Sequence, residues 1–372
     1  MSEILRWLFD LVRHVLRTLD WPLLGALSAL MAIGLAVLYS AGGEAQGMRL
    51  VLAQGARFAV GLAAMWGLSR MSPVRLRGWT PGVFVLSLLP LLLVLFIGTG
   101  KHGRHWIDLK LFYLQPSELL KITLPMMMAW YLHHEPLPPR IKTVIISCVL
   151  IAVPTGLILL QPDFGTGMLV AASGVFALLL AGLPWWWVGV GVGSVAAAAP
   201  VAWFWFLRPY QKDRILTFLN PENDPLGTGW NIIQSKIAIG GGGMAGKGWG
   251  QGSQSHLDFL PEHTTDFIFA VLSEEFGWIG VAVVLSLYLF VIARCLWIAI
   301  EARDTYSRLL AGSLGLAFFV YVIVNGGMIS GLLPVVGVPM PLLSYGGTSA
   351  VSLLAGLGLV MAVRAHRPVH GY

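Results

Sequence analysis

The sequence predicts an all-α integral membrane protein with about ten transmembrane helices and one large extracytoplasmic loop. Hydrophobic residues make up 56% of the 372 residues and charged residues only 11%, whereas about one quarter of a soluble domain is charged. Apolar stretches of about 20 residues, long enough to cross a bilayer core, recur along the whole chain. Segments such as 83–97 and 168–183 lack the regularly spaced polar residues of a soluble amphipathic element.

The apolar stretches define ten expected spans, each long enough to cross the hydrocarbon core. They cover residues 21–41, 50–69, 80–98, 115–132, 142–160, 165–183, 185–207, 266–293, 309–332 and 345–363. The sixth and seventh are separated only by Leu183, Pro184 and a run of three tryptophans. Since proline ends a helix and tryptophan prefers the membrane interface, a tight turn is expected there. No internal repeat indicates an inverted-repeat transporter.

The domain organisation is expected to be simple. A cytoplasmic amphipathic segment, residues 1–20, precedes a single membrane domain over 21–367. Within that domain, residues 208–265 form the only large insertion between spans, and we expect it to be extracytoplasmic. Any chemistry outside the membrane must then use this insertion, the 99–114 loop and the adjoining helix ends.

The orientation follows from the basic residues in the loops. With the N-terminus inside, the inner loops carry 13 lysines and arginines and the short outer loops carry 4. The inner set is Arg6, Arg13, Arg17, Arg70, Arg75, Arg77, Arg140, Lys142, Arg294, Arg303, Arg308, Arg364 and Arg367, and the outer set is Arg49, Lys101, Arg104 and Lys110. This bias predicts that both termini are cytoplasmic and that the insertion faces outward.

Charged residues at the outer ends of the spans are the first functional candidates, because burying a charge is costly unless it pairs or meets water. Glu118 and Lys121 lie three residues apart on one helix face. They form either a structural ion pair or a polar cavity in which Lys121 meets an anionic substrate, and Arg57 could join them. Asp163 precedes a helix, so it could serve as the N-cap or place a carboxylate at the mouth of such a cavity.

Asp266 stands at the expected outer start of a long span. It could cap that helix, but the two threonines before it could do so without a charge. A carboxylate that is partly removed from water at a membrane interface is a better base than a hydrated one. Glu274 and Glu275 are expected about 12 Å deeper, at 1.5 Å per residue of continuous helix. We expect at least one of them to pair with a buried donor.

Residues 241–248 nearly match a phosphate-binding loop. The motif needs serine or threonine after the lysine and a preceding strand, and Gly248 follows Lys247 instead. We therefore expect a flexible glycine hinge beside the catalytic face, and no nucleotide or nucleic-acid ligand. Cys148 and Cys295 lack the spacing of a disulfide framework or a metal site.

Several motifs, in the same order along essentially the whole chain, resemble the SEDS (shape, elongation, division, sporulation) family of peptidoglycan glycosyltransferases. They are residues 38–41 (LYSA), 103–107 (GRHWI), 115–118 (QPSE), 161–165 (QPDFG), 259–262 (FLPE), 265–269 (TDFIF), 331–337 (GLLPVVG) and 344–349 (SYGGTS). Residues 252–257 (GSQSHL) and the PVVG of 334–337 favour the elongation branch, RodA, over the division branch, FtsW. His105 stands where the family usually has arginine.

The resemblance implies an enzyme that polymerises lipid II, an undecaprenyl-pyrophosphate disaccharide-pentapeptide, at the outer face of the bacterial cytoplasmic membrane. The essential aspartate of the family corresponds to Asp266, which would act as general base. The candidate substrate-binding residues are Arg57, Trp106, Glu118, Lys121, Asp163, Arg214, Gln234, Lys236 and Glu262. Implied partners are a class B penicillin-binding protein and other membrane proteins of the elongation machinery. No ligand cluster demands a metal, although a divalent cation could bridge the phosphates.

Two other functions fit parts of the sequence. A lipid II flippase or other polyprenyl-lipid transporter would share the spans and the substrate, but it predicts a charged path through the bilayer. The charges here gather toward the outer face, which favours the enzyme. A non-enzymatic scaffold for cell-wall synthesis would leave Asp266 dispensable.

Overall fold

The computed structural model describes residues 18–100, 105–108, 110, 113–207, 209–223, 228–256 and 263–366. Within these ranges regular structure is almost entirely helical, and the two strands, β1 (Ile107–Asp108) and β2 (Tyr113–Leu114), are two residues long each and pair antiparallel. The predicted all-α class is confirmed. Most of the predicted amphipathic segment, and the candidate Glu262, lie outside the described residues.

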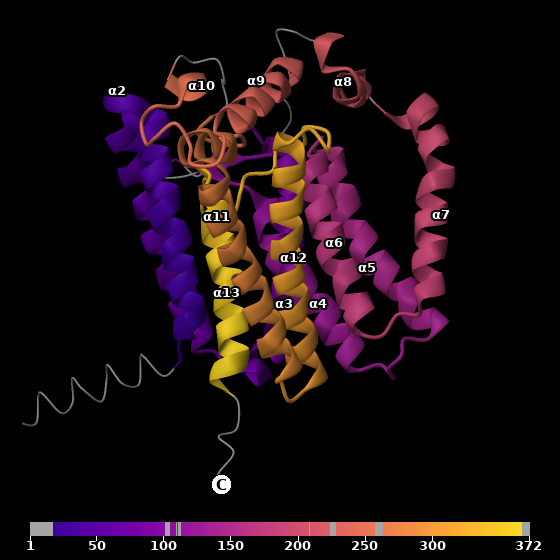
Figure 1. Cartoon of the computed structure of the whole chain (residues 1–372). Coiled ribbons are helices and arrows are strands. Elements are labelled where there is room, and N and C mark those ends of the chain that lie inside the picture. The colour runs from indigo at the N-terminus through magenta and orange to yellow at the C-terminus, as the bar shows by residue number, and fades with distance from the viewer. Residues whose placement is uncertain are drawn as a thin grey trace, which may run out of the picture.

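Each predicted span corresponds to a helix (Figure 1). The helices are α2 (Trp21–Ser69), α3 (Pro73–Ile97), α4 (Pro116–His133), α5 (Ile141–Leu160), α6 (Phe164–Leu180), α7 (Trp185–Val201), α11 (Ile268–Ile300), α12 (Thr305–Ile329) and α13 (Thr348–Ala365). Helix α2 supplies two spans because it is bent at Gly43, whose φ is 60°. Among the described residues, eight helical segments are long and apolar enough to cross a membrane, with the two halves of α2 counted separately. The other two are α6, with 17 residues, and α4, which carries Glu118 and Lys121.

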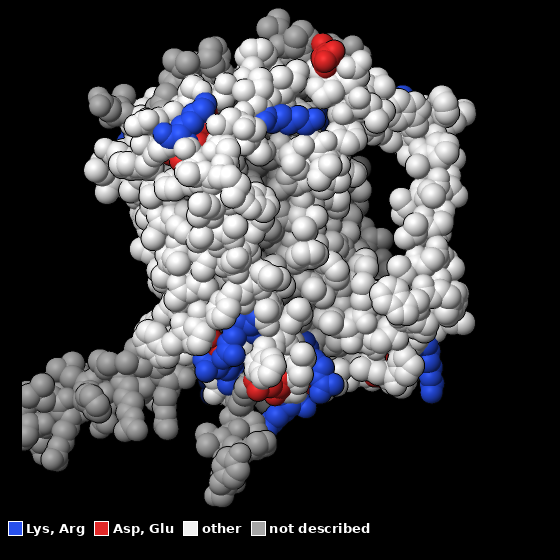
Figure 2. Space-filling view, in the orientation of Figure 1, with Lys and Arg blue, Asp and Glu red and all other residues white. Residues whose placement is uncertain are grey.

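The helices differ greatly in how far they are packed. In the apolar window of α12, 72% of residues are buried, whereas none are in the segment Trp185–Trp205 that contains α7. Helix α7 stands apart from the bundle, and the space-filling view shows an opening beside it (Figure 2). On the face shown, charged side chains gather at the two ends and leave an uncharged belt between them. That distribution suits a protein surrounded by lipid.

The predicted large loop folds as a set of short helices over one end of the bundle, here called the insertion end (Figure 1). They are α8 (Pro209–Leu219), the 3-10 turn η2 (Pro221–Asn223), α9 (Thr228–Gly241) and α10 (Ser253–His256). At the opposite end, the buried Asp20 carboxylate accepts hydrogen bonds from Arg294 and lies 2.8 Å from Nη1 of Arg364. These contacts join the start of α2 to the ends of α11 and α13, so both described chain ends lie at the opposite end.

Helix α11 is not the continuous helix that the sequence led us to expect, because it is broken at Gly277, whose φ is 61°. The glycine-rich turn at 242–248 packs directly on the break, and a Cβ atom on Gly277 would lie 2.4 Å from the Gly246 nitrogen. Four backbone hydrogen bonds of 2.9–3.1 Å connect the turn to α11, from the N–H groups of Lys247, Gly248, Trp278 and Ile279 to the carbonyls of Glu274, Glu275, Gly243 and Met244. Where a flexible hinge was expected, the structure has a packed clamp that satisfies the backbone groups exposed by the kink.

Two glutamates of α11, Glu274 and Glu275, lie just before this kink. Glu274 accepts a 2.6 Å hydrogen bond from Lys247 Nζ and a 2.9 Å bond from the Ser253 N–H, both of which belong to the insertion. Glu275 accepts a hydrogen bond from the Ser40 hydroxyl. The expectation that at least one of them pairs with a buried donor is confirmed by Ser40. The expected depth of the two glutamates relative to Asp266 stays a prediction, because the break at Gly277 follows both of them.

Candidate active site

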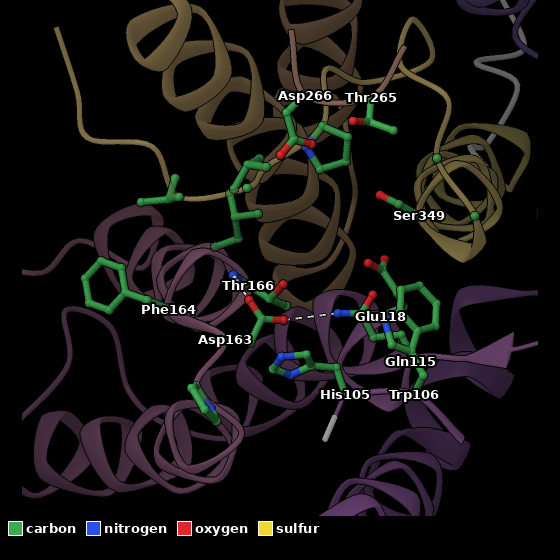
Figure 3. A pocket seen from close by; sticks show the side chains of 18 of the residues that line it. His105, Trp106, Gln115, Glu118, Asp163, Phe164, Thr166, Thr265, Asp266 and Ser349 are labelled. Atoms are coloured by element: carbon green, nitrogen blue, oxygen red, sulfur yellow. Dashed lines mark hydrogen bonds between the residues drawn. The ribbon is translucent and has the colours of Figure 1, made fainter. Parts of the chain in front are cut away.

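A cavity of about 710 Å³ lies at the insertion end, between the bundle and α8. Figure 3 shows walls from the His105–Trp106 segment, α4, α6, the turn before α11 and the start of α13. Helix α8 and the loop that leads from α12 to α13 complete the lining. Six residues expected at the site line this one cavity: Trp106, Glu118, Lys121, Asp163, Arg214 and Asp266. Residues far apart in the chain thus meet in a single polar pocket.

The Glu118–Lys121 pair forms on α4 as its spacing predicted. Lys121 Nζ lies 2.6 Å from Glu118 Oε1; the glutamate is buried, and the lysine side chain is 10% exposed. The other carboxylate oxygen accepts a hydrogen bond from the Ser352 hydroxyl of α13. The Lys121 ammonium also lies 5.1 Å from the centre of the Tyr321 ring, a cation–π distance. These contacts hold the ammonium at the cavity wall.

Asp163 is the N-cap of α6, as its position before the helix suggested. One oxygen accepts a 3.0 Å hydrogen bond from the Thr166 N–H and the other accepts a 3.0 Å bond from Gln115 Nε2 (Figure 3). Both oxygens of Asp163 and of Glu118 are thus engaged by protein donors. That arrangement suits positioning better than proton uptake.

Asp266 lies in a turn, two residues before the first residue of α11. The N-cap is Phe267, which makes no side-chain capping bond, so Asp266 does not occupy the N-cap position. The side chain is half-buried and lines the cavity. Its carboxylate faces the loop after α12, where a Cβ on Gly337 would lie 3.6 Å from Asp266 Oδ2. The turn is held by a 2.9 Å bond from the Tyr345 N–H to the Thr264 carbonyl.

Two cations approach the cavity in different ways. Arg214 of α8 lines it and donates a 3.3 Å hydrogen bond to the Val335 carbonyl. Arg57 lies behind the cavity wall, where it donates a 3.0 Å bond to the Tyr345 hydroxyl and stacks on that ring. Arg57 therefore acts on the cavity through Tyr345.

The two candidates from α9 lie elsewhere. Helix α9 docks on the end of α12, where the Ser235 hydroxyl donates to the Ile329 carbonyl at 2.9 Å. Gln234 is buried, whereas Lys236 is exposed and covers Gly331. Neither lines the cavity.

The structure adds residues that sequence reasoning did not single out. Asp213 and Ser349 line the cavity, and the Ser352 hydroxyl donates a hydrogen bond to Glu118. Asp213 directly precedes Arg214, a predicted substrate-binding residue, and that position was the signal that could have identified it. Ser352 stands in a run of small apolar residues and gave no signal. His105, noted as unusual, also lines the cavity.

The arrangement can bind an anionic substrate and remove a proton from it. Lys121 and Arg214 supply positive charge, and Trp106 supplies an aromatic surface, with its ring near Gly347. Among the residues that the structure describes, no three His, Cys, Asp or Glu side chains form a metal-binding group. Asp266 contributes a half-buried carboxylate to the same cavity.

Comparisons with known proteins agree over nearly the whole chain. The family model for FtsW, RodA and SpoVE, described as cell cycle protein, matches residues 15–368. Peptidoglycan glycosyltransferase MrdB of Escherichia coli K12 is 47% identical over 350 residues, which cover 94% of each chain. The probable peptidoglycan glycosyltransferase FtsW of Trichlorobacter lovleyi is 36% identical, covering 98% of this chain and 97% of the relative.

Two solved structures share the fold. One belongs to "Structural coordination of polymerization and crosslinking by a peptidoglycan synthase complex", with a TM-score of 0.82 and 32% identity over 94% of this chain and 99% of the other. The second is the rod shape determining protein RodA of Thermus thermophilus, with a TM-score of 0.70 and 30% identity over 92% of this chain and 96% of the other.

Proposed function

This chain belongs to the FtsW, RodA and SpoVE family of cell cycle proteins and is a peptidoglycan glycosyltransferase, and we propose that it polymerises lipid II with Asp266 as the general base. The reaction would take place in the cavity at the insertion end, during cell elongation. The observation that carries the proposal is the meeting of a half-buried carboxylate, Asp266, with two cations in one cavity.

The proposed step needs one base and no acid. The acceptor is a sugar 4-hydroxyl, which is a poor nucleophile until its proton is removed. As the Asp266 carboxylate takes the proton, the acceptor oxygen bonds to the anomeric carbon of the donor sugar. The bond from that carbon to the phosphate oxygen breaks, and its electron pair leaves with the lipid pyrophosphate. Direct displacement inverts the anomeric carbon.

The leaving group explains the cations. A pyrophosphate departs as a stable anion, so it needs positive charge rather than the second, acidic carboxylate of a glycosidase pair. Lys121 and Arg214 would supply that charge, with Glu118 and Asp163 holding the wall in place. A divalent cation bound with the substrate phosphates is compatible with this chemistry.

Replacing Asp266 tests the proposal. Asp266→Asn keeps the shape of the side chain but cannot accept the proton. A positioned base contributes about 10²–10⁴-fold, so polymerisation of purified lipid II should fall by that factor. The thermal stability of the protein and its affinity for lipid II should change little.

The controls are the amide variants of the competing carboxylates, Asp163→Asn, Asp213→Asn and Glu262→Gln, which should cost less. Asp266→Glu should retain partial activity. A folded Asp266→Asn protein that makes glycan chains at near wild-type rate would remove the assignment. Such an enzyme would need one of the other three carboxylates as its base.

Membership of a synthase complex is the second part of the proposal. One structural relative is a chain of a peptidoglycan synthase complex that coordinates polymerization and crosslinking. We infer that the partner here is a class B penicillin-binding protein, which would crosslink the new strands. Co-purification of the two from membranes, with increased polymerisation by the pair, is the expected result.

The orientation of the chain is the third part. The structure places the ends of α2, α11 and α13 that carry Asp20, Arg294 and Arg364 together. Since basic residues dominate the predicted inner loops, this end should be cytoplasmic and the cavity should face outward. A cysteine at position 75 or 303 should resist an impermeant thiol reagent in intact cells. Labelling of either cysteine from outside would contradict this orientation.

A further inference from the structure

We propose that Asn325 is a positioning residue that fixes Asp266 relative to the opposite wall of the cavity. Asn325 lies on α12 and is fully buried. Its Nδ2 donates two hydrogen bonds, one to the Asp266 carbonyl at 2.9 Å and one to the Val338 carbonyl at 2.7 Å. One NH₂ group thus joins the backbone of the base to the backbone of the loop that its carboxylate faces. The inference rests on the proposed role of Asp266.

The turn that carries Asp266 needs such support. It precedes α11, and the N-cap residue Phe267 contributes no side-chain capping bond. A buried carbonyl requires a donor, and the donor for Asp266 comes from a helix 59 residues away in the chain. Two residues earlier, the Thr264 carbonyl accepts a hydrogen bond from the Tyr345 N–H. Asn325 contacts Asp266 itself.

The partner wall is firmly attached to the bundle. Val338 is almost fully buried and packs with Leu169, Tyr321 and Val324. Beside it, Gly337 has a φ of 72° and leaves room for the Asp266 carboxylate, whose Oδ2 would lie 3.6 Å from an added Cβ. Because Asn325 also bonds to Val338, it connects the Asp266 turn to this packed cluster and limits the movement of the turn. A displacement of about 1 Å at a reacting group can cost about 10²-fold in rate.

The chemistry of the side chain indicates why asparagine stands there. Among the described residues, no hydrogen-bond partner accompanies Asn325 Oδ1, so the structure uses only the two N–H donors. An aspartate of the same shape would offer no donor to either carbonyl. Sequence reasoning missed this residue, although a lone amide in an apolar span is costly to bury without partners.

The test compares Asn325→Ala with Ser313→Ala in the full-length protein. Ser313 is equally buried on α12, but its hydroxyl donates within its own helix, to the Leu310 carbonyl. We expect kcat for lipid II polymerisation to fall about 10- to 100-fold in Asn325→Ala, with KM within about twofold. Ser313→Ala should keep both constants. An Asn325→Ala enzyme with wild-type kcat would overturn the inference.

A double variant separates positioning from general damage. If Asn325 acts through Asp266, adding Asn325→Ala to Asp266→Asn should leave the residual rate unchanged, because the base is already lost. A further loss as large as that in the wild-type background would show a merely structural role. Should Asn325→Ala fail to fold, Asn325→Ser retains one donor and should lose kcat to a smaller extent. A folded Asn325→Ser protein with undiminished kcat would also refute the inference.

The two proposals fail in different ways. Full activity of Asp266→Asn removes the assignment of the base, whatever Asn325 does. If Asp266→Asn is inactive and Asn325→Ala is fully active, Asp266 remains the proposed base and only the positioning role of Asn325 is refuted.

Discussion

Two buried carboxylates, one at each end of the bundle, have similar partners and different surroundings. Asp20 at the opposite end pairs with Arg294 and Arg364, and Glu118 at the insertion end pairs with Lys121. Both also contact α13. Glu118, however, lines the 710 Å³ cavity, whereas Asp20 lies where three helix ends meet. The Glu118 pair thus adjoins a space for a ligand, which makes it the functional candidate of the two.

The partners of the two carboxylates also differ in reach. The Glu118–Lys121 pair joins residues three apart on one helix, so its loss leaves the helix packing intact. The Asp20 contacts connect α2, α11 and α13, so their loss separates elements that are distant in the chain. We expect the first pair to matter for turnover and the second for stability.

The largest effect on stability is expected for Asp20→Ala. Removing one partner of a buried pair costs about 3–5 kcal/mol, and we expect the lower end because both arginines are partly exposed. The melting temperature in detergent should fall by about 5–10 °C. The control is Asp304→Ala, which removes only an N-cap with bonds to Ser307 and should cost about 1 kcal/mol. A large loss of turnover in folded Asp20→Ala would break the comparison.

Lys121→Ala should show the reverse pattern. Glu118 keeps its Ser352 donor and can meet water in the cavity, so the melting temperature should move by no more than a few degrees, about 3 °C. Lipid II polymerisation should fall at least about tenfold, equivalent to about 1.4 kcal/mol of transition-state stabilisation. Paired thermal melts and glycan gels provide the measurement. If the variant unfolds while its folded fraction polymerises normally, the pair is only structural.

Ser352→Ala should give the smallest effect and sharpen the comparison. It removes one donor from Glu118 while leaving Lys121 in place, and cavity water can replace that donor. We expect turnover to fall about two- to fivefold, since a hydrogen bond to a charged group contributes about 1.5–3 kcal/mol before such replacement. The matched control is Ser173→Ala on α6, whose hydroxyl donates to Val170 of its own helix. Equal rates in the two variants would remove Ser352 from the site.

Predictions from local spacing were confirmed where the interaction is itself local. The Glu118–Lys121 pair and the Asp163 cap each join residues three apart, and helical geometry alone brings such residues together. The kink at Gly277 could not be read in the same way. A glycine in an apolar run fits a continuous span, and only the turn at 242–248, packed against it, reveals the break.

The sequence by itself determined which segments form membrane helices, because hydropathy and length are sums over neighbouring residues. It did not distinguish α7 from α12, although both are apolar enough to span. None of the apolar window that contains α7 is buried, whereas 72% of the window in α12 is buried. Tertiary structure decided that difference, and it also decided that Asp266, Lys121 and Asp163 share one cavity. The reason is physical: burial and shared cavities depend on which helices pack together, and contacts such as Asn325 to Asp266 join residues that no local pattern relates.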